Sequence, residues 1–394
     1  MFEDAVPPLS NFPNKNISHV NTGDSEWTGV AHAIFMASIL IGENSDYVGA
    51  CPDATLVCAG NDIINSTTIE SIELLFDENI NILNLSLSFS TNTTATADYY
   101  DFIAQYLDYI VYSQNIVVCI SSGNYRGVYG VHNGAMSYNS IVVGNLDDKL
   151  TLSLDDDELD PTSLYSLRED VAIKPDLSAP GDKVGTNLLI ASDEGGTSSA
   201  CAVTSGICAL LMDANPQLIG KPMLVKSILL TSAKRLPNMD SVESTSDYFR
   251  PAISREYGAG MIDAMQAYNI ATGTNKWFYY SNPAITNSNE SYGPNITITQ
   301  NEIIRDKKLI VSFCWNQNVN YVNSNTQVLQ DYCHAIEIYD PNGTRVAYSV
   351  TPYDTKEFIY YTPTVPGTYQ IRVIKLGNNN DGGAIGALSY RIGY

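Results

Sequence analysis

Short apolar runs and amphipathic stretches alternate along the first two thirds of the chain. The runs Ala54 to Cys58 and Ile116 to Cys119 have the length of buried strands, whereas Thr67 to Glu78 carries apolar residues at helical spacing. His32 to Ile41 is apolar, contains small residues at helical spacing and is followed by Gly42, a common helix terminator. Strands that alternate with helices in this way predict βαβ units and a parallel sheet.

From about residue 275 the pattern changes. Short alternating runs such as KLIVSFCW, AIEIYD, TRVAYSV and TYQIRVIKL are separated by turn signals, for example Pro341-Asn342-Gly343. Seven such strands without a helical pattern predict a β-sandwich of about 120 residues. We therefore divide the chain into an α/β domain, residues 1–275, and an all-β sandwich domain, residues 276–394.

Composition narrows the classes of partner. The 394 residues are 44% hydrophobic and 16% charged, as in globular proteins, and their formal net charge is -22. This acidity argues against a nucleic-acid partner. No apolar run has the roughly 18 to 20 residues that would span a bilayer, so we expect no membrane span. The opening Met1 to Asp4 has neither the basic nor the apolar region of a signal peptide.

The seven cysteines form no CxxC pair and have no metal-ligand spacing. Five of them lie in apolar runs of the first 275 residues and are expected to be buried thiols. A disulfide is conceivable only between Cys314 and Cys333.

The stretch from Gly195 to Met212 carries the clearest chemical signal. Gly196-Thr197-Ser198, followed by small residues and then an apolar run, predicts a tight loop that leads into a helix with Ser198 in its first turn. A nucleophilic serine needs such an exposed hydroxyl at a helix N-terminus. The tripeptide alone is more typical of a loop serine before a buried helix.

Several other segments of the chain support the same interpretation of Ser198. GTSSACAVTSGICALLMDANP resembles the nucleophile motif of the subtilisin-like serine peptidases, the subtilase family, and HAIFMASILIG resembles the family's histidine motif. ILNLSLS, SSGN, KPDLSAPG and EYGAGMIDAMQAYN resemble further segments of that family and occur in its order. The resemblance implies a parallel β-sheet with helices on both faces, a site at the carboxyl ends of the strands and a polypeptide substrate.

The resemblance also implies roles for single residues. Ser198 would be the nucleophile and His32 its base, and Asn124 would supply the side-chain donor of the oxyanion hole. One wall of the substrate cleft would be formed by Ser86, Leu87 and Ser88. Departures from the family pattern are Ala33, Ile34 and Ser88, and a second register would align Thr28-Gly29 with the family's His-Gly pair and leave no base.

The third residue of the implied catalytic triad is the carboxylate that orients the histidine. The resemblance places it upstream of His32, where Asp4 is the nearby candidate and Asp24 its rival. A strand leading into Asp4 has almost no residues from which to form. We therefore expect the natural chain to extend upstream with that strand and a propeptide.

Three classes of function follow. The first is a serine endopeptidase that acts through a Ser/His/Asp-type acyl-enzyme; the alternative is a catalytically impaired subtilase-fold pseudoprotease that binds or regulates other proteins. A carbohydrate- or surface-binding role of the sandwich domain is a third. We expect no cofactor, although the acidic stretch Leu154 to Ser163 could hold a structural calcium ion. The resemblance favours a secreted or cell-surface protein.

Overall fold

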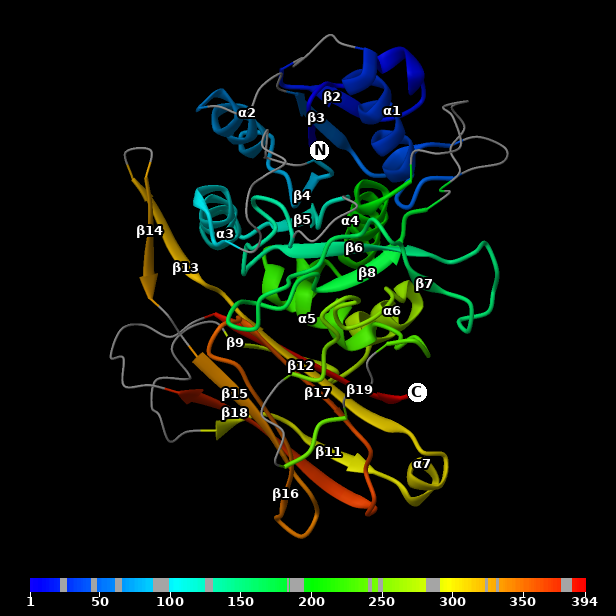
Figure 1. Ribbon diagram of the computed structural model, residues 1–394, viewed down its shortest axis with the longest axis vertical. Helices are drawn as coiled ribbons and strands as arrows, with labels where there is room; N and C mark the ends of the chain where they lie inside the picture. Colours follow the sequence, from blue (N-terminus) through cyan, green and yellow to red (C-terminus); the bar gives the residue numbers. More distant parts are fainter. Residues whose placement is uncertain are drawn as a thin grey trace.

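The computed structural model describes most of the chain: residues 1–21, 27–43, 48–60, 66–87, 99–124, 130–182, 184, 195–239, 243–246, 251–280, 291–322, 325–330, 333–376 and 385–394. A parallel sheet with helices occupies one half of the molecule and antiparallel sheets the other (Figure 1). The predicted fold class, a subtilisin-like α/β sheet followed by an all-β region, is confirmed.

The first sheet has the strand order β2-β3-β1-β4-β5-β6-β7, and β8 also pairs with β6. All of its neighbouring strands are parallel except β6 and β7. Its strands are β1 (Phe2–Glu3), β2 (Ile17–His19), β3 (Leu56–Gly60), β4 (Ile82–Leu85), β5 (Val117–Ser121), β6 (Ile141–Asp147), β7 (Glu158–Leu159) and β8 (Leu177–Pro180). The strand expected to be missing is therefore present as the two residues of β1, between β3 and β4.

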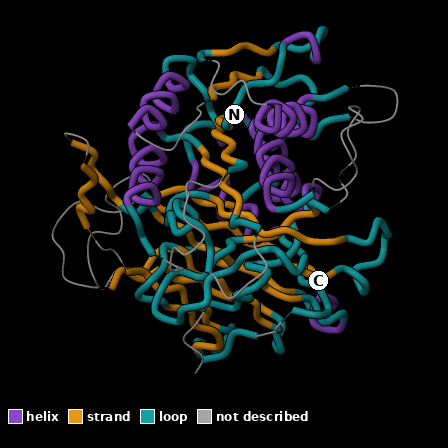
Figure 2. Tube along the Cα trace, turned by 45° about the horizontal axis from the view of Figure 1, so that its top comes forward, coloured by secondary structure: helices purple, strands orange, loops and turns teal. Residues whose placement is uncertain are grey.

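Helices cover both faces of this sheet, as Figure 2 shows. α2 and α3 lie on one side, and α1 and α4 pack against each other on the other side. The helices of this half are α1 (Trp27–Ile41), α2 (Ser66–Phe76), α3 (Phe102–Gln114), α4 (Thr197–Ala214), α5 (Pro222–Ser232) and α6 (Ala264–Thr272).

Helix α4 runs through the centre of the core. It is long and apolar enough to cross a membrane, but 67% of it is buried inside the protein, where it contacts β4, β5, β6 and β8. Small residues such as Ala200, Ala202 and Gly206 allow this close packing. The five cysteines of this half are buried thiols, as expected, and all seven cysteines are free.

The second half consists of antiparallel sheets. Four strands form the sheet β17-β12-β19-β9, and the sheet β10-β18-β15-β16 also carries β11 on β18. Apolar side chains between them, including Phe313, Trp315 and Tyr369, form a separate core. The elements are β9 (Trp277–Tyr280), β10 (Ser291–Tyr292), β11 (Asn295–Ile298), α7 (Gln300–Ile304), β12 (Lys308–Trp315), β13 (Asn318–Val322), β14 (Asn325–Gln330), β15 (Cys333–Tyr339), β16 (Arg345–Val350), β17 (Lys356–Tyr361), β18 (Gly367–Leu376) and β19 (Gly386–Gly393).

Helix α5 joins the two halves. Every residue of α5 is buried, and the helix packs on β12 and β19. The contact includes polar groups as well as apolar ones: Ser227 and Thr231 each form a hydrogen bond with the Ser389 hydroxyl, at 2.8 and 2.7 Å. The β13–β14 hairpin forms a second contact, because Tyr321 packs against Tyr106 of α3 at a ring distance of 5.1 Å.

A buried cluster of charges reinforces this junction. Asp176, just before β8, contacts Lys174 at 3.0 Å, Lys226 of α5 at 3.3 Å and Lys356 of β17 at 3.0 Å. Asp354 contacts Lys356 at 2.6 Å. Burial opposes ionisation of Asp176, but the three lysines hold its pKa well below the ordinary value. Buried ions of this kind are stable only when each has partners, so both halves of the molecule must be in place.

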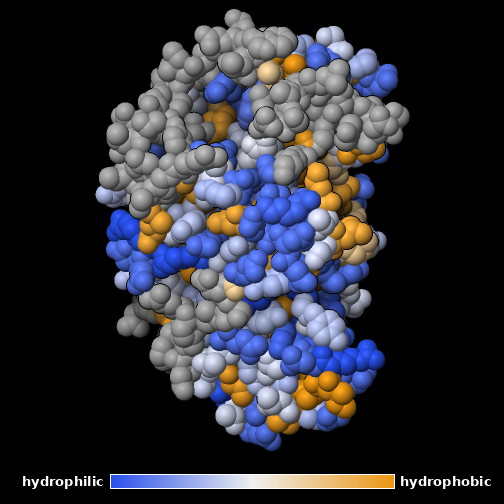
Figure 3. Space-filling view, turned by 45° about the vertical axis from the view of Figure 1, so that its right-hand side comes forward, coloured by the Kyte–Doolittle hydropathy of each residue, from blue (hydrophilic) through white to orange (hydrophobic). Residues whose placement is uncertain are grey.

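The face of the molecule shown in Figure 3 is largely polar. On the face seen in Figure 3, polar side chains dominate the described residues and apolar ones gather only in small groups. Scattered exposed residues such as Leu150, Leu152 and Ile304 are usual for a globular protein.

We predict that Lys356→Met strongly destabilises the protein. The substitution leaves Asp176 and Asp354 with less compensating charge in a buried site, and breaking such a cluster costs about 3 to 5 kcal/mol. Urea unfolding measures the change. Lys149→Met, which removes ion pairs at the surface, serves as the control and should have a much smaller effect. Equal losses in both variants would contradict the prediction.

We also predict an acid-sensitive sandwich core. His334 of β15 is buried against Trp315 and Phe313, and burial, with the charge of Lys375, lowers the pKa of His334 to about 3. Between pH 6.5 and 3 the unfolded chain therefore binds a proton that the folded state does not, so stability falls as the pH falls. This histidine contributes up to about 1.4 kcal/mol per pH unit.

Denaturant unfolding at about pH 7, 6, 5 and 4 measures this effect, because these values lie within the window that linkage sets. The difference in stability between the parent protein and His334→Leu should shift in favour of the variant as the pH falls. Parallel pH profiles for the two proteins would contradict it.

Candidate active site

Ser198 lies where the sequence predicted it, in the first turn of α4. Gly196 precedes the helix with φ +137°, and a Cβ at that position would lie 2.9 Å from Asn124 Nδ2, so only glycine fits this loop. The Gly196 N–H donates to the Gly181 carbonyl of the KPDLSAPG segment at 2.8 Å. The loop therefore presents the half-buried Ser198 at the positive end of the helix dipole.

The hydroxyl of Ser198 has a backbone partner. Its Oγ donates to the carbonyl oxygen of Ser86 at 2.9 Å, and the Ser86 hydroxyl donates in turn to the carbonyl oxygen of Ser198 at 2.8 Å. This reciprocal pair ties the end of β4 to the start of α4.

His32 lies in the second turn of α1, since the helix begins five residues earlier than the motif suggested. Its Nδ1 is 2.9 Å from Glu3 Oε2. The imidazole is 35% exposed and the Glu3 side chain only 2%. A partly open imidazole thus rests on a buried carboxylate, and this contact fixes which ring nitrogen faces the protein.

Glu3, and not Asp4, is the carboxylate beside His32. Successive side chains of a strand point to opposite sides, and in β1 it is Glu3 that points toward α1, whereas Asp4 is exposed. The longer glutamate side chain spans the distance to the ring. Our assignment of this position to Asp4 therefore differs from the structure by one residue, and its rival, Asp24, lies outside the described residues.

Asn124 follows β5 and is held by the start of α4. Its Oδ1 accepts hydrogen bonds from the Thr197 N–H at 2.8 Å and from the Thr197 hydroxyl at 2.9 Å. The Thr197 hydroxyl also accepts the Gly123 N–H at 3.2 Å. Since the amide oxygen is committed to Thr197, the Nδ2 group is the end of the side chain that can donate to a ligand.

The structure describes two of the three residues predicted to line the cleft. Leu87 is half-buried, Ser86 is buried beneath the nucleophile, and Ser88 lies outside the described residues. Asn84 was not predicted: its Nδ2 donates to the Ser86 hydroxyl at 3.0 Å and its Oδ1 accepts from Ser205 at 2.9 Å. Its position two residues before Ser86 on a buried strand was the available signal.

The described residues contain no group of three or more His, Cys, Asp or Glu side chains placed to hold a metal ion. Part of the acidic stretch from Leu154 to Ser163 forms β7, and a calcium site there stays a prediction.

Hydrogen bonds at the start of α4 thus hold Ser198 against Ser86 after β4, and Thr197 against Asn124 after β5. His32 rests on the buried Glu3 at the end of β1. Polar groups of these types at the carboxyl ends of parallel strands are typical of serine hydrolases of the α/β class. Comparison with known proteins identifies the family. The family model of the subtilases, peptidase family S8, matches residues 5–260. The chain belongs to the subtilase family.

Two curated relatives agree with this. The serine protease AprX of Bacillus subtilis (strain 168) is 28% identical over 266 residues, 58% of this chain and 54% of AprX. The subtilisin-like protease SBT3 of Solanum lycopersicum is 33% identical over 110 residues, 24% of this chain and 14% of that protein. The chain thus spans about half of one relative and a small part of the other.

Solved structures share the fold. The prenylagaramide maturation protease PagA is similar with a TM-score of 0.54 and 20% identity, covering 69% of this chain and 93% of PagA. A serine-to-alanine mutant of the protease domain of PatA has a TM-score of 0.52 and 19% identity, covering 69% of this chain and 94% of that domain. The subtilase fold and family support a serine peptidase function.

Proposed function

We propose that this protein is a serine endopeptidase in which Ser198 is the nucleophile, His32 the general base and Glu3 the orienting carboxylate. The observation that carries the proposal is the 2.9 Å contact between His32 Nδ1 and the buried Glu3 Oε2. A carboxylate in this place keeps the second ring nitrogen, Nε2, unprotonated and able to accept a proton.

The proposed reaction uses these side chains in two stages. Ser198 Oγ attacks the carbonyl carbon of the substrate while its proton passes to His32 Nε2. The charge on the carbonyl oxygen is stabilised by Asn124 Nδ2 and the Ser198 N–H. His32 then gives the proton to the leaving amine, and an ester on Ser198 remains. Water then gives a proton to His32 Nε2 and attacks the ester carbonyl carbon. His32 returns that proton to Ser198 Oγ as the bond to the acyl group breaks, which restores the hydroxyl and releases the acyl group as a carboxylic acid.

Glu3 accepts the Nδ1 hydrogen of His32 and stabilises the imidazolium. Its buried position makes this interaction stronger than it would be in water. Glu3 Oε1 is buried without a hydrogen-bond partner among the described residues, so the contact of Oε2 with His32 is the main direct compensation of this carboxylate. The mechanism uses no cofactor, and its substrate is an extended polypeptide.

One observation favours the alternative, a pseudoprotease that binds proteins without cleaving them. The Ser198 hydroxyl donates to the Ser86 carbonyl, and a hydroxyl held there would not attack a substrate. The two functions differ in whether Ser198 reacts.

We predict that a fluorophosphonate probe forms one covalent adduct with the parent protein and none with Ser198→Ala. An activated serine attacks the phosphorus and displaces fluoride, whereas an ordinary surface serine is not nucleophilic enough. Intact-mass spectrometry of both proteins measures the adduct. An unmodified parent protein that is folded by circular dichroism would reject the peptidase and support the pseudoprotease.

We predict that Glu3→Gln lowers kcat by about four orders of magnitude, because an amide stabilises the wrong tautomer of His32 and no imidazolium. Asp4→Asn is the matched control: it makes the same chemical change one residue along and should retain nearly full activity. Turnover of a fluorogenic peptide by the two variants decides between the carboxylates. A large loss in Asp4→Asn with an active Glu3→Gln would refute the assignment of Glu3.

A further inference from the structure

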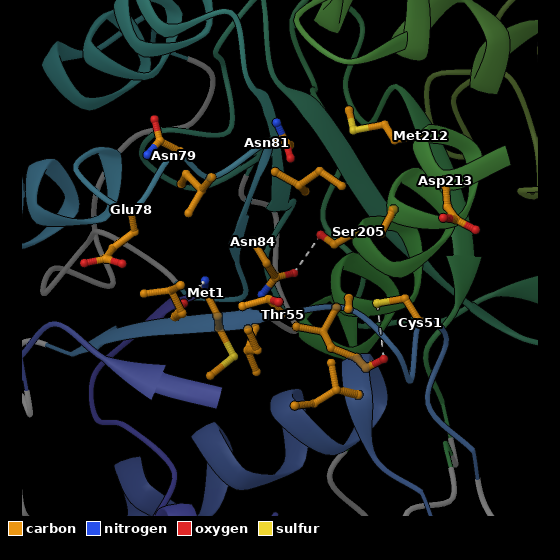
Figure 4. Close-up of a pocket in the computed structure, with 18 of the residues that line it drawn as sticks. Met1, Cys51, Thr55, Glu78, Asn79, Asn81, Asn84, Ser205, Met212 and Asp213 are labelled. Atoms are coloured by element: carbon orange, nitrogen blue, oxygen red, sulfur yellow. Dashed lines mark hydrogen bonds between the residues drawn. The ribbon is translucent and has the colours of Figure 1, made fainter. Parts of the chain in front are cut away.

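A chain of buried hydroxyl and amide groups joins β4 to α4 behind Ser198. The Ser205 hydroxyl donates to Asn84 Oδ1 at 2.9 Å, as the dashed line between these residues in Figure 4 shows. Asn84 Nδ2 donates to the Ser86 hydroxyl at 3.0 Å, and that hydroxyl donates to the Ser198 carbonyl oxygen at 2.8 Å. Asn84 and Ser205 are 3% exposed and Ser86 1%, so water does not compete for these bonds.

The direction of this chain of hydrogen bonds follows from its last member. A carbonyl oxygen accepts hydrogen bonds and cannot donate them, so the single hydroxyl proton of Ser86 points to Ser198. The Ser86 oxygen can then only accept, which places the amide nitrogen of Asn84 on that side and the amide oxygen on the side of Ser205. The orientation of the Asn84 amide is therefore set by the groups around it.

The contacts of Asn84 and Ser86 on the helix lie on one face of α4. Cys201 and Ser205 follow Ser198 by three and seven residues, a spacing that places side chains on the same face of a helix. The Cys201 thiol lies 3.5 Å from Asn84 Oδ1. Asn84 thus contacts this face directly and reaches Ser198 through Ser86. Because β4 is an inner strand of the sheet, these contacts fix both the rotation of α4 and its position along its axis.

Ser86 connects this face to the reacting end of the helix. Its hydroxyl binds the Ser198 carbonyl oxygen, and its own carbonyl oxygen accepts the Ser198 hydroxyl at 2.9 Å. Ser198 is therefore held at its main chain and at its side chain by the same residue. A shift of Ser86 would move both the hydroxyl and the N–H of Ser198 that the proposed reaction uses. A displacement of about 1 Å can cost roughly a hundredfold in rate.

We propose that Asn84 is a positioning residue of the active site, an inference that deepens the proposed peptidase function and rests on it. Asn84 does not touch the reacting atoms. It acts through Ser86, because the Nδ2 hydrogen bond confines the Ser86 hydroxyl to the orientation that fixes the main chain of Ser198. A merely structural link between β4 and α4 would contribute to stability and leave the rate of the chemical step unchanged.

The test begins with Asn84→Leu in the full-length protein, a change that removes the amide at nearly constant volume. Turnover of a fluorogenic peptide should fall at least about tenfold in kcat, with KM changed less than about twofold, because the nucleophile is misplaced while substrate contacts remain. Asn84→Ser, whose shorter side chain cannot reach both Ser86 and Ser205, is the second variant and should show the same loss. Circular dichroism verifies that each variant is folded.

Ser205→Ala is the matched control. It removes the hydroxyl on the other side of Asn84, and Asn84 Oδ1 keeps the Cys201 thiol as a partner. The control should lower the midpoint of urea unfolding, as Asn84→Leu does, but keep kcat within about twofold of the parent value. Equal losses of kcat in Asn84→Leu and Ser205→Ala would overturn the proposal, since they would indicate a general weakening of the contact between β4 and α4.

Combination with Ser86→Ala tests whether Asn84 acts through Ser86. Ser86→Ala removes the hydroxyl that Asn84 holds and should itself lower kcat. The double variant should then lose about as much kcat as Ser86→Ala alone, because Asn84 has no other route to Ser198. Losses that multiply in the double variant would show that the two residues act independently, and the route through Ser86 would be wrong.

The parent protein separates this inference from the function on which it rests. A folded parent protein that does not turn over the peptide would refute the proposed peptidase, and the positioning role with it. An active parent protein together with an equally active, folded Asn84→Leu or Asn84→Ser variant would refute the positioning role alone.

Discussion

The contact between Glu3 and His32 is the interaction on which the proposed function of this molecule depends. It is made by a strand of two residues that lies between two longer strands at the centre of the sheet. Phe2 packs in the core, and Glu3 contacts the histidine. One short segment thereby connects the packing of the sheet with the orientation of His32.

The position of this strand is secured by the rest of the fold. α4 crosses the sheet behind it and presents Ser198, and Thr197 at the same helix end fixes Asn124. α5 packs against the antiparallel half of the molecule, where small hydroxyl groups and the charges around Asp176 are added to the apolar contacts of the core. Such contacts are directional, so they favour one arrangement of the two halves over sliding alternatives.

The fold class and the loop and helix around Ser198 could be predicted from the sequence, because hydrophobic periodicity and local turn residues determine both. The carboxylate beside His32 could not be identified from the sequence. Asp4 matched the residue type that the family uses, but strand alternation decides which neighbour faces the histidine, and a shift of one residue reverses the side chain. The roles of Asn84 and of Lys356 depend on contacts between distant segments, which no local pattern predicts. The sequence leaves almost no residues for a strand before Asp4. The two residues Phe2 and Glu3 nevertheless form β1, because backbone pairing with β3 and β4 on both sides stabilises so short a strand.

The hydrogen bond of the Ser198 hydroxyl to the Ser86 carbonyl opposes catalysis, and its free-energy cost can be compared with the contribution of Glu3. Leaving the Ser86 carbonyl gives up one neutral hydrogen bond, a net cost of about 1 kcal/mol, which corresponds to roughly a fivefold change in rate. A substrate that displaces the hydroxyl recovers part of that cost through its own contacts. Loss of the carboxylate behind the histidine, in contrast, changes rates by about four orders of magnitude in related chemistry. Whether this fold cleaves peptides is therefore decided at Glu3 far more than by the orientation of the serine.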